Sequence, residues 1–134
     1  MADPVLVVED DPRARRTLVE VLHLEGFAPI TAPNGLEALH FLQAGGPAKV
    51  ILLDLFMPVM DGWTFRRAQR ADPRLRHIPV VVMASGDLRA IPAIDADAVF
   101  SKSADVREVV RVVRELCRQR AAGTNEVSDQ SSEG

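Results

Sequence analysis

Five polar side chains each stand at or just beyond the end of a short apolar run, where a buried strand would end. Carboxylates, a hydroxyl and an ammonium group are the groups that divalent cation binding and phosphoryl transfer use. If the apolar runs pair as parallel strands, their carboxyl ends lie at one edge of the sheet and these groups meet there. The five residues are Glu9, Asp10, Asp54, Ser85 and Lys102.

Three of these groups are carboxylates, and their repulsion limits what the cluster can be. A cation would neutralise Glu9, Asp10 and Asp54. Few oxygen ligands with room for water suit Mg²⁺ or Mn²⁺ better than Zn²⁺. A nucleophilic carboxylate beside a bound metal is a recognised route to an aspartyl phosphate. The sequence therefore predicts that Asp54 accepts a phosphoryl group, with Lys102 pairing one phosphoryl oxygen and the Ser85 hydroxyl donating to another.

The elements that must position these groups alternate along the chain. Five apolar runs predict strands, and amphipathic stretches with N-capping residues or glycine stops predict helices between them. We expect an α/β fold with a doubly wound, five-stranded parallel sheet of order 2-1-3-4-5, which is flavodoxin-like and makes the first and third strands neighbours. The strands are expected at Val5–Val8, Phe27–Thr31, Val50–Leu53, Ile78–Met83 and Ala98–Phe100.

The predicted helices begin at Pro12, after Asn34, at Gly62 and at Ala104. Between the fourth and fifth strands we expect only a short or irregular helix, because Pro92 interrupts it. The last helix ends at about Arg120.

Length and composition are those of an ordinary folded protein. The 134 residues, 47% hydrophobic and 26% charged, suffice for one domain. We expect this domain over residues 1–120 and a disordered polar tail over residues 121–134, which almost lack apolar side chains. The formal net charge of -3 comes from three acids of the tail, so residues 1–120 are formally neutral and do not favour a nucleic-acid partner.

No segment predicts a membrane span or an export signal. The apolar runs are far too short to cross a bilayer, and no basic-then-apolar pattern opens the chain. The single cysteine, Cys117, excludes an intramolecular disulfide and fits a reducing compartment. We therefore expect a cytoplasmic protein with no membrane partner.

Four segments have the spacing of a known family. They read VLVVEDD at 5–11, ILLDLFMPVMDG at 51–62, VVVMASG at 80–86 and FSK at 100–102. On these segments the chain resembles a response-regulator receiver domain (CheY-like) across residues 4–120. The most specific part is the Asp followed by Met-Pro and Asp-Gly.

The resemblance implies a role for each site residue. Asp10 would contact the metal directly and Glu9 largely through water, while Asp54 is the phosphoacceptor. The backbone carbonyl of Phe56 would supply a further metal ligand. The conserved hydroxyl and lysine roles of the family would fall to Ser85 and Lys102.

The resemblance also implies partners. A histidine kinase or phosphotransfer protein would phosphorylate the domain, which would act as a phosphorelay acceptor with self-dephosphorylation as its only enzymatic property. We expect a stand-alone regulator, because the 14 residues after Arg120 are too few for an output domain.

Arginines spaced 4, 3 and 4 residues apart form a stripe on the last helix. The stripe is either a solvated face or the docking surface of a downstream protein, and the sequence leaves a homodimer open. It consists of Arg107, Arg111, Arg114 and Arg118. The group Arg13, Arg15 and Arg16 on the first helix is interpreted as a solvated face.

Three departures from the family motivate a second hypothesis, an interaction module that does not depend on phosphorylation. Val99 occupies the usual aromatic position three residues before the lysine, and Phe100, one step on, would face the other side of the strand. Ser103 replaces the proline that usually follows the lysine. Only 16 residues separate Ser85 from Lys102, roughly a helical turn fewer than expected.

A third hypothesis is a small-molecule enzyme on the same fold, either a flavin binder or an aspartyl phosphatase. The loop after the first strand is acidic and lacks the Gly, Ser and Thr residues of a phosphate cradle. The phosphatase would need an acid two residues after its nucleophile, where Phe56 stands.

Overall fold

The structure is a computed structural model that describes residues 2–133 and the side chains of residues 2–119. In it, strands and helices alternate as the sequence predicts. Each predicted strand is found, with ends that agree to within two residues. The strands are β1 (Pro4–Val8), β2 (Ala28–Ala32), β3 (Val50–Asp54), β4 (Val80–Ala84) and β5 (Ala98–Ser101). The α-helices are α1 (Pro12–Leu24), α2 (Gly35–Gln43), α3 (Gly62–Ala71) and α4 (Val106–Glu133).

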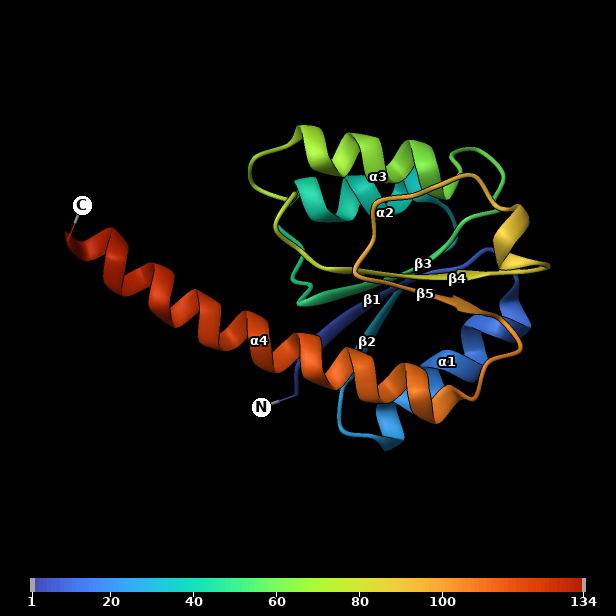
Figure 1. The fold of residues 1–134 in the computed structure, drawn as a ribbon, viewed down its shortest axis with the longest axis horizontal. Helices are drawn as coiled ribbons and strands as arrows, with labels where there is room; N and C mark the ends of the chain where they lie inside the picture. The colour runs from blue at the N-terminus through green and yellow to red at the C-terminus, as the bar shows by residue number, and fades with distance from the viewer. Residues whose placement is uncertain (1, 134) are drawn as a thin grey trace.

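The strands form one parallel sheet of order β2-β1-β3-β4-β5, which confirms the predicted topology. Helices α2 and α3 cover one face, and α1 and α4 cover the other, so the domain has three layers (Figure 1). Strands β1 and β3 lie side by side at the centre of the sheet. Their carboxyl ends, which carry the predicted acidic residues, therefore meet at one edge.

Two separate cores hold the central strands in place. In β3, Ile51 and Leu53 pack into the core beneath α2 and α3, whereas Val50 and Leu52 pack into the core against α1 and α4. Burying such a side chain contributes about 1.5–3 kcal/mol. Because β3 is buried on both faces, its last residue, Asp54, has little freedom to move.

Three helices begin at the residues that the sequence predicts. Asp11, Asn34 and Asp61 each accept a hydrogen bond from a backbone N–H group in the first turn of the following helix. Such a cap is worth about 1 kcal/mol. Two of these caps also fix the points where the chain turns away from the carboxyl ends of β1 and β3.

An irregular segment, residues 91–97, joins β4 to β5. Only one 3₁₀ turn, η1 (Leu88–Ala90), precedes it, so the predicted short helix is confirmed. Ile91 and Ile94 pack against the core on the α3 side. The segment thereby takes part of the place that a full helix would fill.

Side chains of α3 donate hydrogen bonds to the backbone of segment 91–97. The Trp63 indole N–H donates to the Pro92 carbonyl (3.2 Å), and Arg66 Nε donates to the Asp95 carbonyl (2.7 Å). Arg66 is buried and also donates to the Gln69 side chain at 2.7 Å. Segment 91–97 is thus attached at a few points and has no hydrogen-bond ladder along its length.

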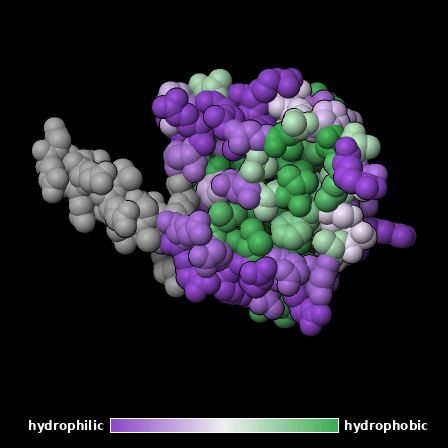
Figure 2. Space-filling model, in the orientation of Figure 1, coloured by the Kyte–Doolittle hydropathy of each residue, from purple (hydrophilic) through white to green (hydrophobic). Residues whose placement is uncertain are grey.

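The short connection leaves one face of β5 uncovered. Phe100 packs into the core against α1 and α4, as expected, so Val99 faces the opposite side, where it is 41% exposed. Apolar residues gather on the visible face above α4, near the β5 edge of the sheet (Figure 2). Val99 is therefore a surface residue. Within β5, Phe100 does not take over the position, three residues before the lysine, where the family usually has an aromatic side chain.

The last helix differs from the prediction. Helical backbone continues in α4 to Glu133, whereas the sequence predicts that the helix ends near Arg120. The polar tail over residues 121–134 stays a prediction. Among the side chains of α4 that the structure describes, Cys117 is the last that packs into the core. The boundary near residue 120 stays a prediction, since the side chains from there on lie outside the described residues.

Val59, between β3 and α3, adopts a positive φ of 71° and is 76% exposed. This conformation costs a β-branched residue about 1–2 kcal/mol, more than the roughly 0.5–1 kcal/mol of backbone entropy that glycine would add. We expect Val59→Gly to raise the free energy of unfolding slightly in urea denaturation. Val99→Gly, in an extended strand, is the matched control and should lower it. A loss of stability in Val59→Gly would contradict the assignment of strain.

Candidate functional site

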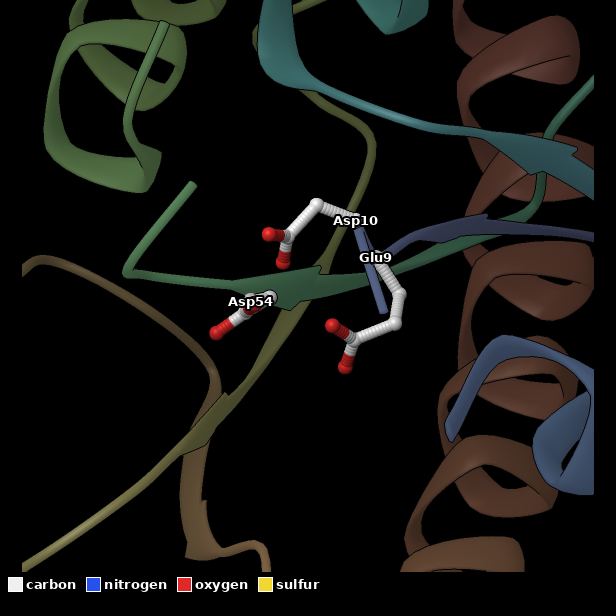
Figure 3. Close-up of side chains that lie close together, drawn as sticks. All are labelled: Glu9, Asp10 and Asp54. Atoms are coloured by element: carbon white, nitrogen blue, oxygen red, sulfur yellow. The ribbon is translucent and has the colours of Figure 1, made fainter. Parts of the chain in front are cut away.

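Three carboxylates meet where β1 and β3 end. Glu9 and Asp10 directly follow β1 in the chain, and Asp54 is the last residue of β3. One oxygen from each carboxylate lies within 4.8 Å of the others. Figure 3 shows the three side chains pointing toward a common space beyond the strand ends. The structure thus brings together the acidic residues that the sequence predicts to converge.

Lys102 completes the group from the end of β5. Its backbone N–H donates to the Ala84 carbonyl at the end of β4 (2.9 Å), which places it beside the cluster. Its Nζ lies 2.8 Å from Glu9 Oε1 and 3.3 Å from Asp54 Oδ2. Glu9 and Asp54 are only 2% and 3% exposed. The lysine is therefore the positive charge that offsets two buried carboxylates.

One positive charge does not balance the cluster. Burial and the nearby charge of Glu9 raise the pKa of Asp54 from 3.8 to about 7, against the smaller opposing effects of Lys102 and the Phe56 N–H. Burial lowers the pKa of Lys102, but its contacts with Glu9 and Asp54 outweigh this, and the pKa is raised overall. The ammonium group stays charged, while Asp54 titrates near neutrality.

The turn after β3 donates a backbone hydrogen bond to the Asp54 carboxylate. The Phe56 N–H donates to Asp54 Oδ1 (3.3 Å), and the Phe56 ring packs edge-on against Trp63 with centroids 5.4 Å apart. A Cβ on Gly62 would lie 2.8 Å from the Leu55 Cα atom, so only glycine lets α3 start this close to the end of β3. This close approach explains the Asp-Gly pair. The role of the Phe56 carbonyl as a ligand stays a prediction.

Ser85 directly follows β4 at the same edge of the sheet and is exposed. Among the described residues its hydroxyl makes no hydrogen bond with the carboxylates or with Lys102. Its predicted role toward a phosphoryl oxygen stays a prediction. Ser103, where the family usually has proline, bonds instead with Ser101 through their hydroxyl groups (2.8 Å).

Arg15 does not belong to a solvated face, so the prediction for this residue is wrong. It is half-buried, and its Nη1 donates to the carbonyl oxygens of Glu9 (2.9 Å) and Asp10 (3.4 Å). Its place four residues after the cap Asp11 is the signal that could have found it. One turn into α1, its side chain reaches back over the acidic loop.

The arginine stripe of α4 is not a free positive surface. Each member has an acidic partner at 2.7–2.9 Å, so much of its charge is neutralised within the domain. The pairs are Arg107–Asp105, Arg111–Glu108, Arg114–Glu25 and Arg118–Glu115. This favours the solvated-face interpretation, and a docking role for the stripe stays a prediction.

The donor set fits a hard divalent cation. Carboxylate oxygens from Glu9, Asp10 and Asp54 converge without a cysteine or histidine in the group, and Asp10 is open enough to face solvent. Few carboxylates with space for water and phosphate oxygens are typical of Mg²⁺ or Mn²⁺ sites.

Comparison with known proteins identifies the class. Residues 5–114 match the family model of the response regulator receiver domain, and the chain belongs to this family. Receiver domains are generally phosphoacceptors rather than enzymes; they work with histidine kinases or phosphotransfer proteins in two-component signalling and bind Mg²⁺ at an acidic pocket.

Curated relatives differ in length. The response regulator Rre1 of Synechocystis is 34% identical over 96% of this chain, which spans 58% of Rre1. An uncharacterized 14.6 kDa protein of Leptolyngbya boryana is 32% identical over 84% of this chain and 88% of its own length. The chain thus spans little more than half of some relatives and nearly all of others.

Solved structures agree on the fold. The receiver domain of a histidine kinase from Syntrophus aciditrophicus has a TM-score of 0.81 and 30% identity, covering 88% of this chain and 92% of that one. A response regulator from Chloroflexus aurantiacus has the same TM-score with 25% identity, covering 88% of this chain and 99% of that one.

Among the described residues, no helix combines the length and apolarity needed to cross a membrane.

The raised pKa of Asp54 makes a prediction about stability. Between pH 4 and about 7 the folded protein keeps a proton on Asp54 that the unfolded chain has lost, so this residue's contribution to stability falls as the pH rises. In EDTA, Asp54→Asn should therefore be more stable than wild type by roughly 1–3 kcal/mol at pH 8, with a smaller gap at pH 5. Thermal unfolding at both pH values measures this.

Saturating Mg²⁺ should stabilise the wild type at pH 8 and narrow the gap, since a cation offsets the repulsion. Carboxylates distant from the site contribute equally to both proteins, so the comparison reports Asp54 together with its interactions with Glu9 and Lys102. A gap that does not widen from pH 5 to pH 8 would show that Asp54 keeps an ordinary pKa.

Proposed function

We propose that this domain accepts a phosphoryl group on Asp54 from a histidine kinase or phosphotransfer protein, with Mg²⁺, and signals by protein contact. The observation that supports the proposal is the meeting of three carboxylates and Lys102 at the carboxyl ends of β1, β3 and β5. We place this activity in the cytoplasm, where such kinases present their phosphorylated histidine.

The transfer exchanges one bond to phosphorus for another. An oxygen of the Asp54 carboxylate attacks the phosphorus atom, a P–O bond forms, and the P–N bond to the donor histidine breaks as its imidazole nitrogen takes the electron pair. Attack by water on the same phosphorus later returns the carboxylate and releases inorganic phosphate. Asp54 must be ionised to attack, so its pKa of about 7 makes neutralisation of the cluster important.

Each neighbouring side chain has a part in this step. Glu9, Asp10 and the Phe56 carbonyl would hold the cation together with Asp54. The bound cation would supply positive charge to the carboxylates and to the phosphoryl oxygens. Lys102 would leave its contact with Asp54 to pair a phosphoryl oxygen, and Ser85, exposed at the end of β4, would turn its hydroxyl toward another.

Treatment with a small phosphodonor tests the proposal. With acetyl phosphate and Mg²⁺, intact-mass spectrometry should detect one added phosphoryl group on the wild type and none on Asp54→Asn or in EDTA. Lys102→Met, which retains the aliphatic stem without the charge, should take up phosphate at least about 100-fold more slowly. Equal labelling of Asp54→Asn and wild type would refute Asp54 as the acceptor.

A second candidate function is a receiver-fold module that binds its partner without a phosphorylation switch. The exposed Val99, the single 3₁₀ turn and the attachment of segment 91–97 to α3 favour it. In these features the path from the site to the surface differs from that expected of the family.

Amide chemical shifts distinguish the two functions. If the switch operates, adding beryllofluoride and Mg²⁺ should move resonances at residues 86–103 as well as those near Asp54. The matched control is Asp54→Asn, which should show neither change. Shifts confined to the neighbourhood of Asp54, with partner binding unaltered by beryllofluoride, would support the module instead.

A further inference from the structure

The loop that carries two of the three carboxylates is held by an arginine. Arg15 Nη1 donates to the carbonyl oxygens of Glu9 (2.9 Å) and Asp10 (3.4 Å). Arg15 is half-buried, while Arg16, the next residue, is exposed. One guanidinium thus bonds the backbone of two consecutive acidic residues.

These carbonyls matter because backbone position decides where short carboxylate side chains can reach. On the other side of the loop, the Glu9 N–H donates to the Ala32 carbonyl at the end of β2 (3.1 Å). The Asp11 N–H donates to Glu9 Oε2 (3.2 Å), so this contact depends on a carboxylate that a cation would attract. Arg15 holds the loop through backbone oxygens alone, so its bonds can persist when the carboxylates turn toward a cation.

We propose that Arg15 is a positioning residue for the cation site: it fixes the backbone of Glu9 and Asp10 so that their carboxylates stay gathered beside Asp54. This role rests on the proposed function. The positioning effect of Arg15 favours cation binding, whereas its positive charge opposes it, because a guanidinium near the cluster repels a divalent cation. Geometry and charge therefore act in opposite directions on cation affinity.

That opposition provides a matched pair of variants. Arg15→Met removes the charge and the two hydrogen bonds, whereas Arg16→Met removes a charge one residue away and none of the described bonds to the loop. If Arg15 acted only through charge, both changes would tighten cation binding or leave it unchanged. If Arg15 positions the loop, Arg15→Met weakens binding although a repelling charge is gone.

Mn²⁺ binding, followed by the electron paramagnetic resonance signal of the free ion, tests this without any phosphoryl transfer. We expect Arg15→Met to raise the Kd about 10-fold, as is typical when a group that orients metal ligands is lost. Arg15→Lys, which keeps the charge but not the fork of donors, should lie between, and Arg16→Met should match or exceed wild-type affinity. Wild-type affinity in Arg15→Met would overturn the role.

Amide hydrogen exchange in EDTA gives a readout that needs no metal. The Asp11 N–H should exchange faster in Arg15→Met than in wild type or Arg16→Met, when the three proteins are compared under conditions in which their thermal stability is equal. If Arg15→Met does not fold, Arg15→Lys decides: unchanged Kd and exchange would overturn the role. Failure of the wild type to bind Mn²⁺ would instead overturn the proposed cation site, so the two failures are distinguishable.

Discussion

Repulsion among Glu9, Asp10 and Asp54 is the constraint on which the rest of this structure depends. Two of these carboxylates are almost fully buried, and burial without compensation is unfavourable. The packed cores on both faces of β3 hold Asp54 at the strand end regardless. Lys102 compensates part of the charge, and the remainder appears as the raised pKa of Asp54. Folding energy thus maintains an electrostatic imbalance that a cation or a proton can relieve.

The sequence predicts most of the fold because local and long-range signals agree. The doubly wound parallel sheet follows from the alternation of elements, its strand order from the resemblance to the family, and the caps at Asp11, Asn34 and Asp61 stand where the helices begin. The convergence of the acidic residues follows from parallel strands in which the first and third are neighbours. These features depend on patterns that repeat along the chain, so they can be predicted from a single sequence.

Features that depend on single side-chain contacts could not be predicted in this way. The basic character of the cluster does not show that Arg15 bonds to the acidic loop while Arg16 is exposed; only the place of Arg15 one turn after the cap Asp11 indicates it. The pairing of Arg114 with Glu25 joins residues 89 positions apart.

The reduced connection between β4 and β5 has a consequence for association with other chains. The strand order makes β5 an edge strand, the short connection leaves its Val99 exposed, and an open apolar edge allows a foreign strand to pair. Two features oppose this: β5 is only four residues long, and charged residues, Asp97 and Lys102, bound it. Lys102 therefore serves twice. The residue whose ammonium group offsets part of the acidic cluster also ends the edge strand with a charged residue, which disfavours pairing with a foreign strand.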